Sequence, residues 1–261
     1  MRRNQLFWGG ILVLLGFVML ANAMGITLPN GNSLMSLFFP LLLIGFGIFV
    51  LVGVFMRGKV DTESASIDLQ GASEAGLRIN HGAGELNVRS GAGANEFMRG
   101  SFVGGVEHKT SRNGDRLEVK MRPAKDFVDF PFFGPRSQLD WDVALNASVP
   151  TKLDFSLGAN KSNLDLHDMT ITDLRFKTGA SDTTLTLPAK GRLNADFEIG
   201  AASLTLIVPD GVAIRVRASL GAGDLSVNRS RFPQDVSPDF ETAANAVDIH
   251  VKGGACSVKV K

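Results

Sequence analysis

Apolar and polar residues alternate along the stretch from Leu153 to Val227, and this pattern returns every 21 residues. Alternation with a period of two predicts β-strands that bury one face. A Gly-Ala pair separates the two alternating runs of each repeat and supplies a turn that a residue with a Cβ resists. A unit of this length cannot bury its apolar face alone, so we expect the copies to stack into a β-solenoid-like domain. The corner glycines are Gly158, Gly179, Gly200 and Gly221.

A series of alternating charges supports stacking in register. If successive rungs lie about 4.8 Å apart, residues at equivalent positions form columns on the outer face. Lys177 and Glu198 are neighbours in one such column, two residues before their glycines. A slipped stack would bring like charges together, so we interpret the columns as devices that fix register. A strip that binds a charged ligand is the alternative. Four residues before the glycines stand Asp154, Arg175, Asp196 and Arg217.

Further copies of the repeat flank the regular stretch. Residues 77–88 and 249–260 each alternate around a Gly-Ala pair. We therefore predict one all-β stacked-strand domain over residues 77–261. A polar connector, residues 60–76, precedes it.

Two other segments depart from the period. Residues 97–106 and 107–121 predict strands, with a hairpin turn at Asn113-Gly114. Residues 228–244 contain prolines and no alternation, which indicates an irregular insertion before the last copy of the repeat.

The first part of the chain has a different pattern. Residues 6–26 and 34–56 are almost entirely apolar, and each is long enough to cross a bilayer as a helix. The uncharged linker between them, residues 27–33, contains turn-forming residues. The sequence therefore predicts a transmembrane hairpin over residues 1–59, with the lipid bilayer as a partner.

The basic residues predict the orientation of this hairpin. Arg2 and Arg3 precede the first apolar segment, and Arg57 and Lys59 follow the second. Because positive charges are enriched on the cytoplasmic side, we expect both termini and the β domain in the cytoplasm. The pattern at 21–23, Ala-Asn-Ala, also fits a signal-peptide cleavage site. Cleavage there would still leave the second helix to return the chain to the cytoplasm.

Four phenylalanines gather between the hairpin turn and the regular repeats, together with two prolines. Aromatic residues dominate the energetics of interfaces, so we predict that this loop docks a membrane partner. A loop that caps an open side of the stack is the alternative. The residues are Phe127, Phe130, Phe132 and Phe133.

The sequence offers little catalytic chemistry. A net charge of +1 provides no field that would attract nucleic acid. The four histidines are dispersed, and none stands at metal-ligand spacing with cysteine or carboxylates. The densest polar cluster, Asp165 with His167 and Asp168, lies at a strand end, and the single cysteine, Cys256, occupies a small-residue position after Gly-Ala. We predict no catalytic residue, cofactor, metal site or small-molecule substrate, and no enzymatic activity.

The apolar hairpin, with Trp8-Gly-Gly and Phe39-Pro40 as its markers, resembles the membrane region of LiaI/LiaF-like bacterial proteins. The Gly-Ala-x-x-x-Leu-x-Leu units are similar to the toast-rack or adhesin-like β domains of that family. The resemblance implies a regulator that restrains a membrane sensor kinase responding to cell-envelope stress. A membrane-tethered scaffold that self-associates through its strand edges is the alternative.

Overall fold

A computed structural model describes residues 62–124 and 139–261, together with residues 13, 15–17, 19, 20, 24, 25, 40 and 42–44. The chain divides into two compact units, and the unit formed by Lys59–Pro131 with Arg136–Lys261 contains all the strands. Residues 15–17 and 42–44 are helical, but most of the two predicted membrane helices falls outside the described residues. Within the described part, no helix is long and apolar enough to cross a membrane.

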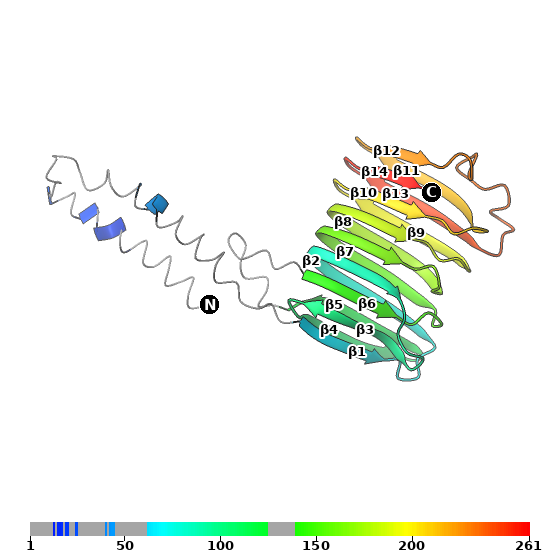
Figure 1. Cartoon of the computed structure of the whole chain (residues 1–261), viewed down its shortest axis with the longest axis horizontal. Helices are drawn as coiled ribbons and strands as arrows, with labels where there is room; N and C mark the ends of the chain where they lie inside the picture. The colour runs from blue at the N-terminus through cyan, green and yellow to red at the C-terminus, as the bar shows by residue number, and fades with distance from the viewer. Residues whose placement is uncertain are drawn as a thin grey trace. The chain divides into compact units, whose positions relative to one another are not determined.

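The β domain confirms the stacked-strand prediction (Figure 1). Its strands are β1 (Thr62–Asp68), β2 (Glu74–Ser90), β3 (Glu96–Val103), β4 (Val106–Asn113), β5 (Arg116–Pro123), β6 (Leu139–Leu145), β7 (Thr151–Asp165), β8 (Ile171–Thr186), β9 (Arg192–Ile199), β10 (Ser203–Ile207), β11 (Ala213–Leu220), β12 (Asp224–Val227), β13 (Ala246–Gly253) and β14 (Ser257–Val260).

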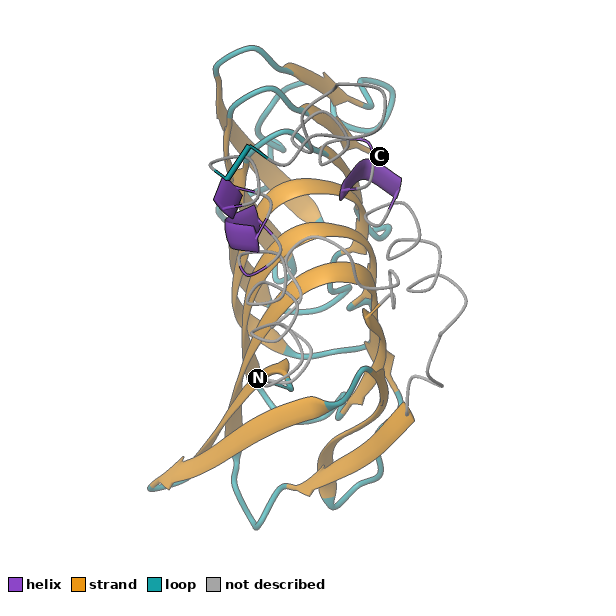
Figure 2. Cartoon of the chain, turned by 90° about the vertical axis from the view of Figure 1, so that its left-hand side faces the viewer, coloured by secondary structure: helices purple, strands orange, loops and turns teal. Residues whose placement is uncertain are grey.

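Each rung crosses two walls that meet at the Gly-Ala corner, and the rungs lie one above another (Figure 2). Strands β2, β7 and β8 are long enough to run through both walls, whereas later rungs are split at the corner into two strands. Wall A has the order β4-β5-β2-β7-β8-β9-β13-β11, and wall B has the order β1-β3-β6-β2-β7-β8-β10-β14-β12.

The core lies between the walls and follows the alternation read from the sequence. Phe155, Phe176 and Phe197 occupy equivalent positions on three successive rungs and are fully buried. Their ring centroids lie 6.2 and 6.1 Å apart, so each ring packs on the next along the stack. Burying a side chain of this size stabilises a fold by about 1.5–3 kcal/mol. The register that aligns the aromatic column is therefore strongly preferred.

The corner glycines form a second column, and crowding explains them better than turn geometry. None of the corner glycines in the regular repeats has a positive φ. Instead, a Cβ on Gly158 would overlap the carbonyl oxygen of Gly82, and one on Gly200 would overlap that of Gly179. At these two corners glycine is required because successive rungs approach each other too closely for a side chain, whereas a Cβ on Gly221 would lie 3.6 Å from its nearest atom.

The order of the last two rungs corrects the sequence interpretation. The final segment in the chain, β13 and β14, lies between the β9–β10 rung and the β11–β12 rung. His250 therefore separates Asp196 from Arg217, which the sequence pattern had placed next to each other. A period of 21 residues shows which segments are rungs, but it does not show the order in which they stack. The rung formed by β11 and β12, here called the terminal rung, ends the stack.

The opposite end of the stack is built from antiparallel strands. β4 pairs with β5 through a two-residue turn, Gly114-Asp115, in which Gly114 has φ +61°; the hairpin lies where the Asn113-Gly114 signal predicts it, with the turn one residue later. β1 pairs with β3 and lies within the predicted connector at residues 60–76. Its alternation is weak because it is an edge strand whose side chains are mostly exposed. The β domain therefore begins earlier than the predicted residue 77.

The charge column gives a first prediction. Arg175 lies directly between Asp154 and Asp196, and its guanidinium contacts Asp173 at 3.8 Å. Arg175→Asp should lower the stability of the domain by about 0.5–1 kcal/mol at low salt, because it places carboxylates on three adjacent strands. The loss should shrink in high salt, where exposed charges are screened. Thermal melts should show this, and Arg175→Gln, which adds no negative charge, is the control. An unchanged melting temperature at low salt would contradict the role of this column.

Candidate interaction surface

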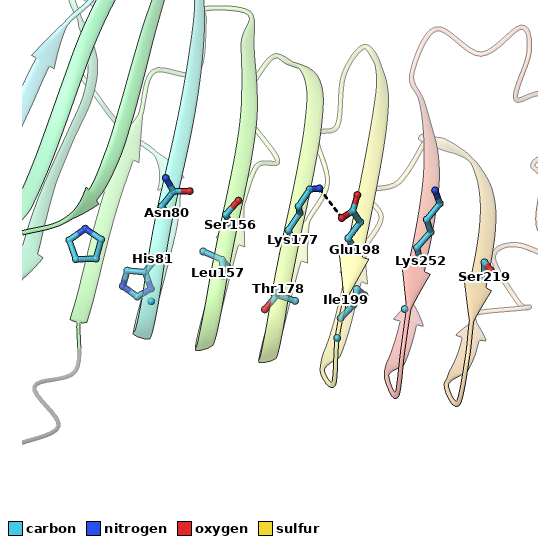
Figure 3. Close-up of a pocket in the computed structure, with 14 residues that line it drawn as sticks. Asn80, His81, Ser156, Leu157, Lys177, Thr178, Glu198, Ile199, Ser219 and Lys252 are labelled. Carbon is cyan, nitrogen blue, oxygen red and sulfur yellow. Dashed lines mark ion pairs between the residues drawn. The ribbon is translucent and has the colours of Figure 1, made fainter. Parts of the chain in front are cut away.

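A polar row crosses the outer face of wall A, two residues before each corner glycine (Figure 3). Glu198 stands between Lys177 and Lys252 in this row, and Lys177 Nζ lies 2.8 Å from its carboxylate. The hydrogen bond from Lys177 lowers the pKa of Glu198. A depression follows the row near the corner. The members in spatial order are Asn80, Ser156, Lys177, Glu198, Lys252 and Ser219.

The charged members of this row alternate in sign. One carboxylate lies between two ammonium groups, and the remaining members are neutral. Exposed pairs of this kind contribute only about 0.2–1 kcal/mol each. The row therefore fits the register role, and its two lysines and one glutamate leave a net charge of only +1.

The interior behind the corner holds polar side chains instead of a cavity for chemistry. His81 is buried, and its Nε2 lies 2.9 Å from the carbonyl oxygen of Leu139. Burial lowers the pKa of His81. Burial also raises the pKa of the Cys256 thiol, which makes it a poor nucleophile. Within the described ranges, no three His, Cys, Asp or Glu side chains are grouped so that they could hold a metal ion.

The terminal rung presents the most unusual surface of the domain, because its outer edge is only half covered. The insertion at residues 228–245, here called the cover, lies against the first half of β11. Val216 N–H donates to the carbonyl oxygen of Asp235 at 2.7 Å, and Ser237 N–H donates to that of Ile214 at 2.8 Å. Beyond Val216, no strand in the described part of the chain pairs with this edge. We call residues 217–226 the open edge.

Alternate residues of the open edge point their main-chain hydrogen-bonding groups away from the stack. Alternate residues of a strand bond to opposite neighbours. The main-chain groups of Ile214 and Val216 bond outward to the cover. The main-chain N–H and C=O groups of Ala218 and Leu220, which follow in alternation, must therefore also point outward. On the other half of the rung, Asp224 N–H donates inward to the carbonyl oxygen of Cys256. The main-chain groups of the next residue, Leu225, therefore point outward. Unpaired edges of this kind are sites where another strand can be added.

The apolar side chains at the open edge are also less covered than their equivalents in the stack. Ala218 is exposed, and Leu220 and Leu225 are only partly buried against the core. In the adjacent rung, Val258 is in register with Leu225 and Val251 is in register with Ala218, and both valines are buried. The open edge thus combines free main-chain groups with an incompletely covered apolar layer.

An ion network fixes the terminal rung onto its neighbour. Asp248 of β13 is buried and accepts hydrogen bonds from Arg215 and from Arg217, the latter at 2.7 Å. His250 Nε2 lies 3.0 Å from the same carboxylate, and the Arg215 guanidinium packs 4.3 Å from the centroid of Phe240 in the cover. This network joins the intercalated strand, the terminal rung and the cover.

The network predicts a dependence of stability on pH. Burial alone would raise the pKa of Asp248, but the hydrogen bond and charge of Arg215, with Arg217 and His250, hold it below the usual value. A lowered folded-state pKa means that the ionised group stabilises the fold above its unfolded pKa of about 3.9, and that this contribution is lost in more acidic solution. At pH 7, Asp248→Asn should cost about 1–3 kcal/mol.

Denaturant unfolding at pH 7 and at about pH 3 would test this prediction, because the unfolded-state pKa of Asp, about 3.9, lies between these values and the contribution of the ionised group declines below it. The difference between the natural chain and Asp248→Asn should narrow at the lower pH. Asp210→Asn is a suitable control, because the Asp210 side chain is fully exposed. A difference of the same size at both pH values would exclude the proposed role of the ionised carboxylate.

The structure describes some of the candidate residues from the sequence analysis and not others. Phe127, Phe130, Phe132 and Phe133 lie outside the described residues, so their predicted docking role stays a prediction. The His167 side chain contacts its neighbour, with Nδ1 2.7 Å from Asp168, in an exposed turn after β7, and the His167 carbonyl oxygen accepts from Ala189 N–H. The open edge was missed. The alternation of Ala218 and Leu220 matches that of inner rungs, so this pattern does not indicate that the rung is terminal.

Comparison with known proteins agrees with this architecture. The model of the N-terminal domain of toast_rack, DUF2154, matches residues 56–207. Among solved structures, the fold is similar to a "putative cell adhesion protein" from Clostridium sporogenes ATCC 15579. That likeness has a TM-score of 0.66 and 19% identity, and it covers 77% of this chain and 98% of the other.

A "putative adhesin" from Bacteroides fragilis NCTC 9343 matches with a TM-score of 0.30 and 10% identity, over 77% of this chain and 97% of the other. No curated protein matches the chain. The family match extends over more than half of the chain and includes the rungs from β1 to β10. The chain therefore belongs to the family defined by the N-terminal domain of toast_rack.

Proposed function

We propose that this chain is a non-enzymatic, membrane-tethered interaction protein that binds another protein chain as an added strand on the open edge. The single observation that carries the proposal is the terminal rung, which offers outward main-chain groups over residues 217–226 beside the cover. Strand addition obtains affinity from main-chain hydrogen bonds and specificity from the alternate side chains. The stacked fold supports a structural role, because its described residues serve packing and register.

The tether belongs to the same proposal. The two apolar segments, residues 6–26 and 34–56, would hold the domain at the bilayer. Confinement at a membrane raises the effective concentration of a partner that is anchored in the same way, so a short edge can suffice for binding. The resemblance of the apolar hairpin to LiaI/LiaF-like proteins supports a membrane sensor kinase as the regulated partner.

A second role, a scaffold that self-associates, is favoured by a specific feature of the structure. A stack closed at both ends would leave only side surfaces for contact. Here the terminal rung is uncovered over half its length, and uncovered strand edges tend to pair with like edges.

One substitution tests the proposal at the open edge. Ala218→Pro removes an N–H that points outward and therefore breaks no hydrogen bond within the stack. The tagged full chain would be purified from membranes in mild detergent, and co-purified proteins, including a differently tagged second copy, would be quantified by mass spectrometry. We expect Ala218→Pro to lose these partners, whereas Ala218→Val keeps them because valine retains the N–H and favours strands. A folded Ala218→Pro variant that retains every partner would overturn the proposal.

The proposed membrane topology has its own test. Because Arg2, Arg3, Arg57 and Lys59 flank the outer ends of the apolar segments, we expect the β domain in the cytoplasm. A reporter that is active only outside the cytoplasm, fused after Lys261, should be silent. The same reporter inserted in the linker at residues 27–33 should be active. Strong activity of the fusion after Lys261 would reverse the proposed orientation.

A further inference from the structure

We infer that the occupant of the open edge is a second copy of this chain, paired antiparallel about a two-fold axis through the Gly221-Ala222 corner. This inference rests on the proposed function, because it names the partner that adds its strand to the same edge. In the pair, β12 of each copy lies beside β11 of the other. A two-fold axis at the corner preserves the bend of both rungs, so the two walls continue across the contact.

The length of the open edge is the first argument. The cover bonds to Ile214 and Val216, and this pairing ends just before Arg217. A long strand from another protein would meet the cover, whereas a second open edge is limited by its own cover at the same position. Residues 217–226 are thus matched in length only to a short segment, and the same ten residues of a second copy satisfy this condition.

The side chains agree with this register. Pairing about the corner places Ala218 opposite the partner's Leu225. The main-chain N–H and C=O groups of both residues point outward and can bond to each other. Both side chains lie on the inner face of the rung, so each would cover apolar surface that is exposed in the single chain. Directly opposed residues in an antiparallel pair share a face, so the apolar and polar faces remain separate across the contact.

Charge complementarity is the independent argument for a second copy. The Asp224 carboxylate is exposed and has no ion-pair or hydrogen-bond partner among the described residues. In the two-fold register it lies opposite the partner's Ser219 and diagonal to the partner's Arg217. A serine hydroxyl and a guanidinium are both donors suited to a carboxylate, and diagonal neighbours are within reach of a side chain as long as arginine. Two-fold symmetry forms each contact twice.

The test uses symmetry. The full chain contains one cysteine, Cys256, which is buried and is first replaced by Ser. Ala222→Cys in this background places a thiol next to the two-fold axis, so oxidation should link two copies through the same residue. Asp210→Cys, an exposed position away from the open edge, is the matched control and should form no comparable link. Crosslinking would be measured on the full chain in membranes by non-reducing electrophoresis.

Charge substitutions then test the register. Ser219→Asp would oppose the partner's Asp224, and Asp224→Arg would lie near the partner's Arg217, so each alone should reduce crosslinking at residue 222 by about threefold or more. The two together place Arg opposite Asp at both sites and should restore it. Ser219 neighbours Lys252 in its own stack, so Ser219→Asp is compatible with folding.

Each outcome decides between the hypotheses. Crosslinking at residue 222 that is weakened by the single changes and restored by the pair supports the two-fold contact. No crosslink at residue 222, or a crosslink insensitive to these charges, overturns it. If Ala218→Pro still loses a different protein while residue 222 forms no link, the open edge binds a partner but that partner is not a second copy. Retention of all partners by Ala218→Pro is the separate failure of the proposed function.

Discussion

Gly200→Ala is expected to lower the stability of the β domain by about 3 kcal/mol, the upper end of the usual cost of overpacking a core. The added Cβ would overlap the carbonyl oxygen of Gly179, which is part of the main chain of the adjacent rung. A main-chain atom cannot move without shifting the rung, and the rung is held by Phe176 and Phe197 in the aromatic column. For a domain of about 200 residues, the melting temperature should fall by about 6–12 °C.

Gly221→Ala is the matched control for this prediction, because it changes the same residue type at the same position of another rung. The nearest atom to its added Cβ, the carbonyl oxygen of Gly254, lies 3.6 Å away, an ordinary contact. Circular dichroism melts of the detergent-solubilised full chain should show a small change for Gly221→Ala and a large one for Gly200→Ala. Equal effects would mean that the column of glycines does not reflect close approach between rungs.

Truncation after Asn245 is expected to unfold the C-terminal part of the stack, and not merely to shorten it. The lost segment contains Val247, Ile249, Val251, Val258 and Val260, all buried. At about 1.5–3 kcal/mol for each side chain, the lost burial is roughly 8–15 kcal/mol as an upper bound. This value is comparable to the entire stability of an ordinary domain. Because β13 and β14 are internal, β9 and β11 also lose a hydrogen-bonded neighbour.

Hydrogen exchange followed by mass spectrometry would measure this effect. Protection should disappear from residues 213–227 in the truncated chain. Residues 192–207, which also pair with β8, should lose only part of theirs, and residues 74–90 should keep theirs. A peptide of residues 246–261 added in excess should restore protection at 192–227. Retained protection at residues 213–227 without the peptide would contradict the intercalated position of β13 and β14.

Much of the fold could be predicted from local patterns in the sequence. Alternation around the Gly-Ala pairs identified the rungs, and Asn113-Gly114 identified the hairpin between β4 and β5. These signals are local because each depends on which face of one strand is buried. The register that places Arg175 between Asp154 and Asp196 also followed, since consecutive repeats in this region are neighbours in space, but the ion pair of Arg175 is with Asp173.

The open edge could not be predicted, because it depends on the order of rungs that are equivalent in sequence. β11 and β13 both carry the alternating pattern that suits an internal strand. The decisive contacts are long-range ones, such as Arg215 with Asp248 and the packing of Arg215 on Phe240. β1 was also missed, because an exposed edge strand lacks the strong alternation that burial imposes on inner strands.

The intercalated position of β13 and β14 has a consequence for biosynthesis. The terminal rung, residues 213–227, is synthesised before β13 and β14, which must pair with it on its inner side. During translation the terminal rung therefore either waits unpaired or pairs first with the wrong neighbour, β9 and β10, and must later separate from it. The cover is a long connection between β12 and β13, and it allows β13 and β14 to reach their position between the β9–β10 rung and the terminal rung. The stack is completed only after residue 260 has emerged from the ribosome. Chains whose synthesis stops earlier would expose unpaired strand edges, which proteases and chaperones can recognise.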